Sequence, residues 1–301
     1  MSVATIALLS ALLLLAGWFV FRWWTIEKAR RLQHHGRPLW PNGEDCAVGF
    51  VTNFFDALGI GNFAPTTAYF KLRNRVPDEN IPGTLNAGHT LAVVVEALVF
   101  ISAVTVDALT LVSMIVAAVV GAWLGVGVVA RLPRRAIQLG MGVALIVAGG
   151  LFAAKNVDWL PGGGAALGLE GGRLIFAIAV SFLLGALMML GIGLYAPCLI
   201  LVSLLGMSPL AAFPIMMGSC AFLMPVGGER FIRTGRYNLP AALGLSLGGI
   251  PGVLMAVFIV KSMPMVWLRW LVVCVVVYAA LMMLRSALAA QPQPEAVRSS
   301  Q

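Results

Sequence analysis

The sequence predicts an all-helical integral membrane protein, with an N-terminal anchor helix followed by two inverted-topology repeats. Each repeat is expected to hold one broken or re-entrant segment and three transmembrane helices. Hydrophobic residues make up 60% of the chain and charged residues 11%, whereas soluble proteins carry about a quarter charged residues. Apolar stretches near the roughly 20 residues that cross a bilayer recur as far as residue 284. A motif of the first half also returns in the second half.

Composition excludes several other classes of protein. The formal charge is +8, but the Lys and Arg residues stand in short clusters between apolar runs, which is not the pattern of a nucleic-acid groove. The four cysteines form no CxxC pair of the kind that binds zinc or performs redox chemistry. The sequence therefore indicates no nucleic-acid partner, no metal, no cofactor and no catalytic residues, and its environment is the lipid bilayer.

The first apolar segment, residues 3–20, has no basic residues before it and no A-x-A cleavage site. It is therefore expected to be a retained anchor and not a signal peptide. Basic residues follow it, which places its C-terminal end in the cytoplasm by the positive-inside rule. Residues 1–45 are predicted to form this anchor helix and a basic cytoplasmic linker.

An internal repeat divides the remaining chain. Residues 58–65 read LGIGNFAP and residues 190–197 read LGIGLYAP, an offset of 132 residues. The expected boundaries are repeat 1 at 46–155, an external linker at 156–172, repeat 2 at 173–286 and a disordered cytoplasmic tail at 287–301. The predicted apolar segments are 46–70, 84–105, 108–130 and 136–154 in the first half, and 174–205, 212–226, 240–260 and 266–284 in the second. Two glycine pairs at small-xxx-small spacing favour close helix packing; they are Gly121 with Gly125 and Gly248 with Gly252.

The basic residues decide the orientation of the segments that carry the GIG motif. If these segments crossed the membrane completely, Arg131, Arg134 and Arg135 would face outside, against the positive-inside rule. If each one enters and returns on the same side, the basic clusters share one face and the second half is inverted. Residues 174–190 are nearly long enough to cross, so a broken but spanning helix stays an alternative for the second half.

Each GIG motif is expected to interrupt a helix inside the membrane. Glycine frees the backbone, and proline suits the first turn of the helix that follows. Non-helical backbone at this depth is tolerated when it is buried in protein or lines a cavity, and helix N-termini attract anions. A packing kink is the alternative interpretation. The predicted substrate-binding residues are Gly59, Gly61, Asn62, Pro65, Thr66, Gly191, Gly193, Tyr195 and Pro197.

Three ionisable residues are candidates for binding a coupling ion. Asp56 precedes the first break, and its partner by the repeat is Met188, so the fold does not require a carboxylate there. It could bind a proton or cap backbone groups at the break. His89 and Glu96, seven residues apart on one segment, suit either a proton relay or a polar contact between helices. Glu229 is expected to pair on the surface with its neighbour Arg230.

The duplicated breaks carry a resemblance to a known family. Gly59, Gly61 and Pro65, together with their counterparts Gly191, Gly193 and Pro197, resemble the paired breaks of the TauE/SafE sulfite exporters, also called toluene-sulfonate uptake permeases. The resemblance runs from about residue 46 to 284 and leaves the anchor as an addition. Family members often have a third glycine where this chain has Asn62 and Leu194.

The resemblance implies a multi-pass transporter of the inner cell membrane that moves sulfite, an organosulfonate or a related small anion. An ion gradient would drive the transport, and the paired breaks suit alternating access. A cation-conducting channel and a membrane-embedded assembly factor or enzyme are the alternatives, although the chain contains no HExxH or GxSxG motif. The substrate, the direction, the coupling ion and the oligomeric state stay open.

Overall fold

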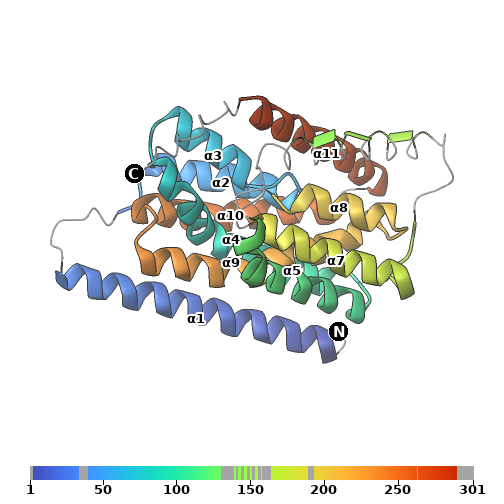
Figure 1. Ribbon diagram of the computed structural model, residues 1–301, viewed down its shortest axis with the longest axis horizontal. Coiled ribbons are helices and arrows are strands. Elements are labelled where there is room, and N and C mark those ends of the chain that lie inside the picture. Colours follow the sequence, from blue (N-terminus) through green and yellow to red (C-terminus); the bar gives the residue numbers. More distant parts are fainter. Residues whose placement is uncertain are drawn as a thin grey trace, which may run out of the picture.

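The structure, a computed structural model, describes residues 3–33, 40–129, 164–188, 193–262 and 264–289, and separate residues between 139 and 157. These residues form helices and one isolated bridge, between Ala166 and Met207. Five helices are long and apolar enough to cross a membrane, and two apolar helices are shorter. The described chain is therefore an all-helical, multi-pass membrane protein (Figure 1).

The helices follow the same order in both halves. Helix α1 spans Val3–Gln33 and lies along one side of the molecule (Figure 1). The first half continues with α2 (Gly43–Ala57), α3 (Phe63–Leu72), the 3-10 turn η1 (Asp78–Asn80), α4 (Ile81–Ala103) and α5 (Ala108–Val129). The second half has α7 (Gly171–Met188), α8 (Tyr195–Leu204), η2 (Pro209–Ala211), α9 (Ala212–Thr234), α10 (Leu239–Ser262) and α11 (Met265–Ala289). Most of the predicted segment 136–154, with Arg131, Arg134 and Arg135, lies outside the described residues.

Local sequence explains where the helices end. After α3, Asn74 adopts a left-handed conformation with φ of 48°, and the N–H of Arg75 donates to the Phe70 carbonyl. After α8, Gly206 has φ of 95° and the N–H of Met207 donates to the Val202 carbonyl. This is the Schellman termination, and it occurs at positions that the repeat relates. The two halves thus share their helix ends as well as their helix order.

The helix before each break packs against a helix of the other half. Helix α2 lies against α10, and α7 lies against α5. A Cβ added at Gly252 would collide with the Phe50 carbonyl oxygen, and one added at Gly121 with that of Phe182. Because Phe50 and Phe182 correspond in the repeat, the same close contact occurs twice, as expected for small residues between helices in lipid. Gly248 makes a similar contact with the Cys46 carbonyl; the surroundings of Gly125 lie outside the described residues.

Helices α4 and α9 pack together at the centre of the molecule. In the apolar stretch of each of these helices 78% of the residues are buried, against 17% in α1. Phe100 of α4 stacks on Phe213 of α9 with ring centroids 5.2 Å apart. The central pair therefore forms the core, and α1 presents most of its surface outward.

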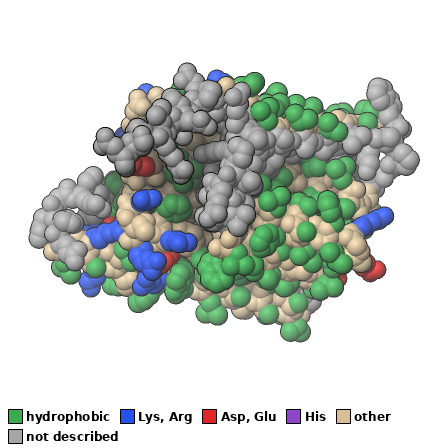
Figure 2. Space-filling view, viewed as in Figure 1, with side chains coloured by type: hydrophobic (Ala, Val, Ile, Leu, Met, Phe, Trp, Pro, Cys, Tyr) green, Lys and Arg blue, Asp and Glu red, His purple; other side chains and the backbone are tan. Residues whose placement is uncertain are grey.

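Ion pairs gather several helix ends on one side, which we call the basic end. Asp45, at the start of α2, pairs with Arg75 after α3 at 2.9 Å. Arg22 of α1 pairs with Glu229 of α9 at 2.7 Å, which corrects the expected pairing of Glu229 with Arg230. The two helices approach closely enough for this longer-range contact. Lys and Arg side chains gather mainly toward this end, and hydrophobic side chains cover much of the remaining visible surface (Figure 2).

Backbone contacts define the opposite end. The N–H of Asp107, after α4, donates to the Leu167 carbonyl at 2.8 Å, and the N–H of Ser208, after α8, donates to the Ala166 carbonyl at 2.9 Å. Residues 164–170 lead directly into α7. Thus α2 begins and α3 ends at the basic end. By contrast, α7 begins and α8 ends at the opposite end.

Candidate functional site

The first break is built by its two glycines. The N–H of Gly59 donates to the Asp56 carbonyl at 2.7 Å and that of Ile60 to the Phe55 carbonyl at 3.1 Å, which ends α2. Gly59 has φ of 95° and Gly61 has φ of 88°, a region that residues with a Cβ rarely adopt. Pro65 lies in the first turn of α3, where its missing N–H leaves no helical bond unmade. The predicted interruption at residues 59–61 is confirmed.

The second break lies between α7, which ends at Met188, and α8, which begins at Tyr195. Gly191 falls within residues 189–192, which lie outside the described residues. Gly193 is described and exposed, and Pro197 lies in the first turn of α8. A Cβ added at Gly61 or at Gly193 would meet no atom within 4 Å. Open space therefore adjoins both breaks.

Both breaks present the N-terminus of a short helix. Asn62 precedes α3 and Leu194 precedes α8, and neither makes a side-chain capping bond. The first N–H groups of a helix have no partner within it, and they carry part of the positive end of the helix dipole. Two uncapped N-termini are thus available to an anion that reaches the breaks.

A buried hydrogen-bond network surrounds the first break. The Asn62 side-chain amide donates to Asn53 Oδ1 at 2.9 Å and to Asp56 Oδ2 at 2.7 Å. His89 lies 3.1 Å from Asn53 through Nδ1 and 3.1 Å from Thr66 Oγ1 through Nε2. All five side chains are buried. The structure therefore brings together Asp56, Asn62, Thr66 and His89, which were predicted site residues.

Thr66 has two possible acceptors for one proton. Its hydroxyl oxygen lies 2.7 Å from the Asn62 carbonyl oxygen and 3.1 Å from His89 Nε2. A hydroxyl group donates a single hydrogen bond, so donation to His89 leaves the Asn62 carbonyl without it. The direction of this bond depends on whether Nε2 of His89 carries a proton. The network can therefore respond to protonation of the histidine.

Asn53 belongs to this network and was not predicted from the sequence. Its amide donates to the Gly49 carbonyl at 2.7 Å, and its Oδ1 faces both Asn62 and His89. The available signal was its position three residues before Asp56 on one apolar segment, since residues at this spacing share a helix face. A polar amide inside a membrane segment also requires partners.

Glu96 connects the two breaks. The Tyr195 hydroxyl, from the start of α8, donates to Glu96 Oε2 of α4 at 3.0 Å. Asp56 lies close enough for its charge to act on Glu96, and Glu96 Oε1 has no hydrogen-bond partner among the described residues. All three side chains are buried. A pair of acids therefore lies between the first break and the first turn of α8.

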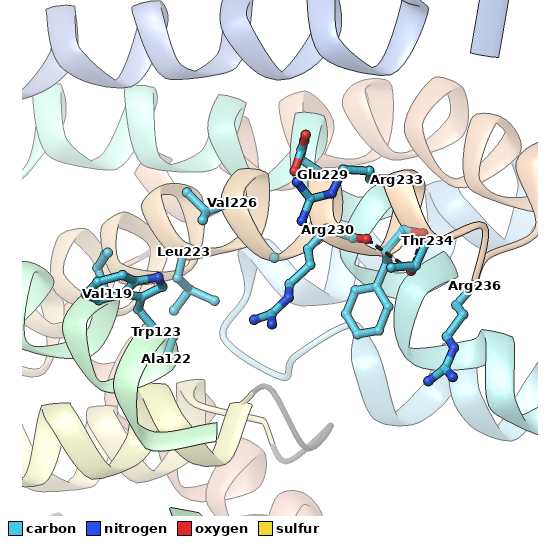
Figure 3. A pocket seen from close by; sticks show the side chains of 12 residues that line it. Val119, Ala122, Trp123, Leu223, Val226, Glu229, Arg230, Arg233, Thr234 and Arg236 are labelled. Atoms are coloured by element: carbon cyan, nitrogen blue, oxygen red, sulfur yellow. Dashed lines mark hydrogen bonds between the residues drawn. The ribbon is translucent and has the colours of Figure 1, made fainter. Parts of the chain in front are cut away.

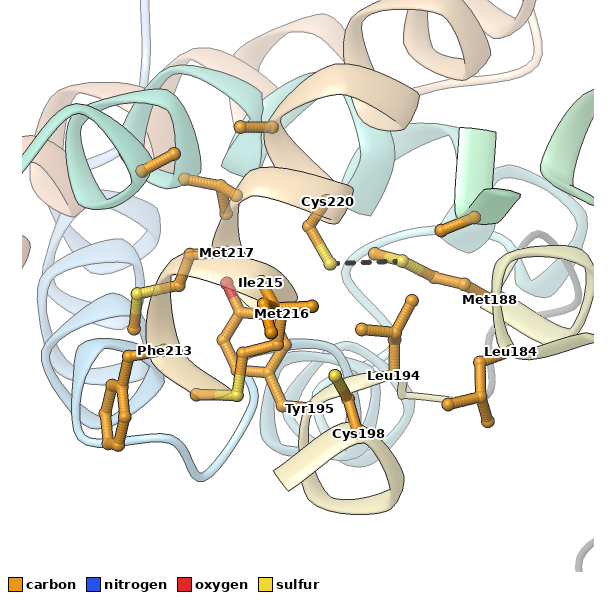
Figure 4. Close-up of a cluster of buried hydrophobic side chains, with 14 of the residues drawn as sticks. Leu184, Met188, Leu194, Tyr195, Cys198, Phe213, Ile215, Met216, Met217 and Cys220 are labelled. Carbon is orange, nitrogen blue, oxygen red and sulfur yellow. Dashed lines mark hydrogen bonds between the residues drawn. The ribbon is translucent and has the colours of Figure 1, made fainter. Parts of the chain in front are cut away.

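The second half replaces the polar network with apolar and sulfur-containing side chains. At the offset of 132 residues, Gly185 takes the place of Asn53, Met188 of Asp56, Leu194 of Asn62 and Cys198 of Thr66. Met188 Sδ lies 3.4 Å from Cys220 Sγ, and Tyr195, Met216 and Ile215 belong to the same buried cluster (Figure 4). Tyr195, at the position of Phe63 in the repeat, brings a hydroxyl group of the second half to Glu96.

Comparison with protein families identifies the chain. The family model described as Sulfite exporter TauE/SafE matches residues 2–152, just over half of the 301 residues. This chain belongs to the TauE/SafE family. The matched range contains Asp56, His89 and Glu96, and it includes α1, which was expected to be an addition to the family pattern. Comparisons with curated proteins and with solved structures gave no match.

Membership of the TauE/SafE family makes this chain a membrane transport protein, in agreement with its apolar helices. The described residues contain no group of three or more His, Cys, Asp and Glu that could hold a metal ion. At the two breaks, the TauE/SafE chain brings together two uncapped helix N-termini, neutral hydrogen-bond donors and two buried acids. These groups suit binding of a solute and exchange of protons.

Proposed function

We propose that this protein is a secondary transporter that moves a small anion across the inner cell membrane by alternating access. Sulfite, organosulfonates and related anions are the proposed substrate class, consistent with its family. The hydrogen bond from Tyr195 to Glu96 carries the proposal. This bond joins the first turn of α8 to Glu96, and Glu96 lies near enough to Asp56, at the end of α2, for their charges to interact. The two breaks therefore share one buried polar site.

The two halves are proposed to be inverted repeats, at 46–155 and 173–286, around this site. Helices α2 and α3 form a hairpin with both of its ends at the basic end, supported by the pairing of Asp45 with Arg75. Helices α7 and α8 form the corresponding hairpin at the opposite end, supported by the bridge of Ala166 with Met207. In known inverted-repeat transporters such breaks meet near the midplane of the membrane. The positive-inside rule assigns the basic end to the cytoplasm.

The proposed anion site uses dipoles in place of cationic side chains. No Lys or Arg whose side chain the structure describes is buried. The N–H groups at the starts of α3 and α8, with the Asn62 amide, would hold the anion. Binding without a fixed positive charge keeps the anion weakly held, so that it can be released on the other side of the membrane. Pairing with a buried Lys or Arg would make release slower.

Asp56 and Glu96 are proposed to couple anion movement to protons. Two neighbouring carboxylate charges buried inside the membrane repel each other and lack hydration. One proton bound to either acid relieves this repulsion, and a second proton removes the remaining negative charge. An anion is repelled less when both acids are neutral, so protons and the anion are expected to bind together. Loss of the protons would then favour release of the anion.

The purified protein in liposomes tests this proposal. Uptake of labelled sulfite, an alkyl sulfonate and a simple carboxylate is measured with and without a proton gradient. Wild type should show saturable uptake of a sulfur oxyanion that the gradient accelerates. Asp56→Asn and Glu96→Gln should lose the acceleration by the gradient while retaining anion exchange, and Glu79→Gln, at an exposed acid outside the site, should resemble wild type. Transport of another solute with no movement of any sulfur oxyanion would refute the proposed substrate class.

A cation channel is the competing function, favoured by the same pair of acids. Carboxylates without a neighbouring cation also suit a cation pathway. Electrical recording in planar bilayers separates the two functions. Unitary current steps carried by a cation would establish a channel, whereas saturable flux without such steps supports a carrier.

A further inference from the structure

A second site lies outside the network, in a pocket between α5 and α9 toward the basic end. Its volume is about 850 Å³, and it shares no residue with the network around Asp56. Val119 and Trp123 of α5 and Leu223 of α9 line its apolar part, and Arg230, Arg233 and Arg236 line the rest (Figure 3). Apolar and basic surfaces thus meet in one cavity.

The arginines of the pocket differ from other basic residues at this end. Arg22, Arg73 and Arg75 each pair with a carboxylate, at 2.7, 3.1 and 2.9 Å. Within the described residues, the arginines of the pocket form no ion pair with a carboxylate. Glu229 also lines the pocket, but its carboxylate is bound by Arg22. The pocket therefore offers unneutralised positive charge to a ligand.

Figure 3 shows Arg230 and Arg236 extending to the same side of α9, with Trp123 and Val119 at the other part of the pocket. The Trp123 side chain is 71% exposed and Val226 is 42% exposed. Both belong to apolar stretches of helix, where exposed side chains contact lipid. One part of the pocket therefore opens toward the hydrocarbon region and the other part toward the charged membrane surface.

We propose that this pocket binds an anionic phospholipid, with the headgroup phosphate on Arg230 and Arg236 and an acyl chain along Trp123 and Val226. Basic pockets between membrane helices on the cytoplasmic side suit anionic headgroups, and guanidinium groups bind phosphate oxygens through two parallel bonds. Free phosphate would leave the apolar part of the pocket without a partner. The lipid uses both parts, and it would hold α5 against α9.

Binding of phosphatidylglycerol to the full chain in detergent tests the proposal, with the dissociation constant measured by native mass spectrometry. The variant is Arg230→Gln with Arg236→Gln. Both side chains are exposed, so the variant should keep the wild-type unfolding temperature. Its affinity should fall by about fivefold for each arginine removed. The matched control is Arg173→Gln at the start of α7, which lies outside the pocket and should bind as wild type does.

Two further experiments test which ligand binds and whether it binds in this pocket. Phosphatidylcholine should bind more weakly than phosphatidylglycerol, and equal binding of both lipids, or equal binding by wild type and the double variant, overturns the proposal. Displacement of phosphatidylglycerol by an equal concentration of inorganic phosphate would assign the pocket to a free anion. Brominated phosphatidylglycerol should quench wild-type fluorescence more than that of Trp123→Phe. Equal quenching would show that the lipid binds elsewhere.

Discussion

The hydroxyl group of Tyr195 donates to the carboxyl group of Glu96 across 3.0 Å, and in the described structure this bond joins a hydroxyl of the second half to an acid of the first. Tyr195 lies in the first turn of α8 and Glu96 in the middle of α4, and both are buried. Movement of α8 relative to α4 would break this bond. Its presence or absence is therefore coupled to the relative position of the two halves.

Removing this hydroxyl tests the coupling. Tyr195→Phe leaves Glu96 without its donor, so the free energy of unfolding should fall by about 1–3 kcal/mol and transport should decrease. Thermal unfolding in detergent and liposome uptake measure the two effects. Tyr237→Phe is the matched control, because Tyr237 donates to buried Glu27 at 2.7 Å away from the site. It should lose stability but keep transport, and loss of transport in both variants would mean that general destabilisation is the cause.

Backbone conformation at the first break gives a second prediction. Gly61→Ala should lower the free energy of unfolding by about 1–2 kcal/mol, because alanine is strained in the left-handed region. No steric clash contributes, since the added Cβ has open space around it. Gly172, at the start of α7, has the same open space but no positive φ, so Gly172→Ala should leave stability almost unchanged. Chemical denaturation of both variants measures the difference, and equal losses would contradict the assignment to strain.

Asn53 provides a test of the hydrogen-bond network. Asn53→Ala removes the acceptor shared by Asn62 and His89 and leaves buried donors unpaired, at a cost of about 1–3 kcal/mol for each group. Proton-driven uptake should fall with stability. Thr52→Val is the control on the neighbouring position, because buried Thr52 bonds only to the Val48 carbonyl among the described residues. If Thr52→Val impairs uptake as strongly, the network has no special role in transport.

The close contact of a glycine with a backbone carbonyl occurs in both halves and predicts similar losses of stability when either glycine is replaced. Gly121→Ala and Gly252→Ala each place a Cβ against a backbone carbonyl of α7 or α2, so the helices must separate and stability should fall by about 1–3 kcal/mol. Gly17→Ala in α1 meets no atom within 4 Å and should raise stability by roughly 0.5–1 kcal/mol through helix propensity. Thermal unfolding checks all three variants. A loss in only one of the two contact variants would mean that the two interfaces are not equivalent.

The helix order and the first break were predictable because they depend on local chemistry. Apolar runs, the GIG motif and a proline define helices and their interruption without reference to the rest of the fold. Asp56 and Glu96 were also recognisable, because an acid in an apolar segment is unusual. Their proximity was not, because it depends on how α2 and α4 approach each other. The partners of Asn53 and the pairing of Glu229 with Arg22 are tertiary contacts of the same kind.

Because the helix before each break packs against a helix of the other half, the order of synthesis has a consequence for folding. Helix α2 begins at Gly43, whereas α10, on which it packs, begins at Leu239. At translation rates of about 5–20 residues per second, α10 follows α2 by roughly 10–40 s. During this interval the Asn53 and Asp56 side chains enter the membrane before their neighbourhood is complete. The polar side chains of the first half therefore stay without the α10 part of their surroundings until α10 has been made.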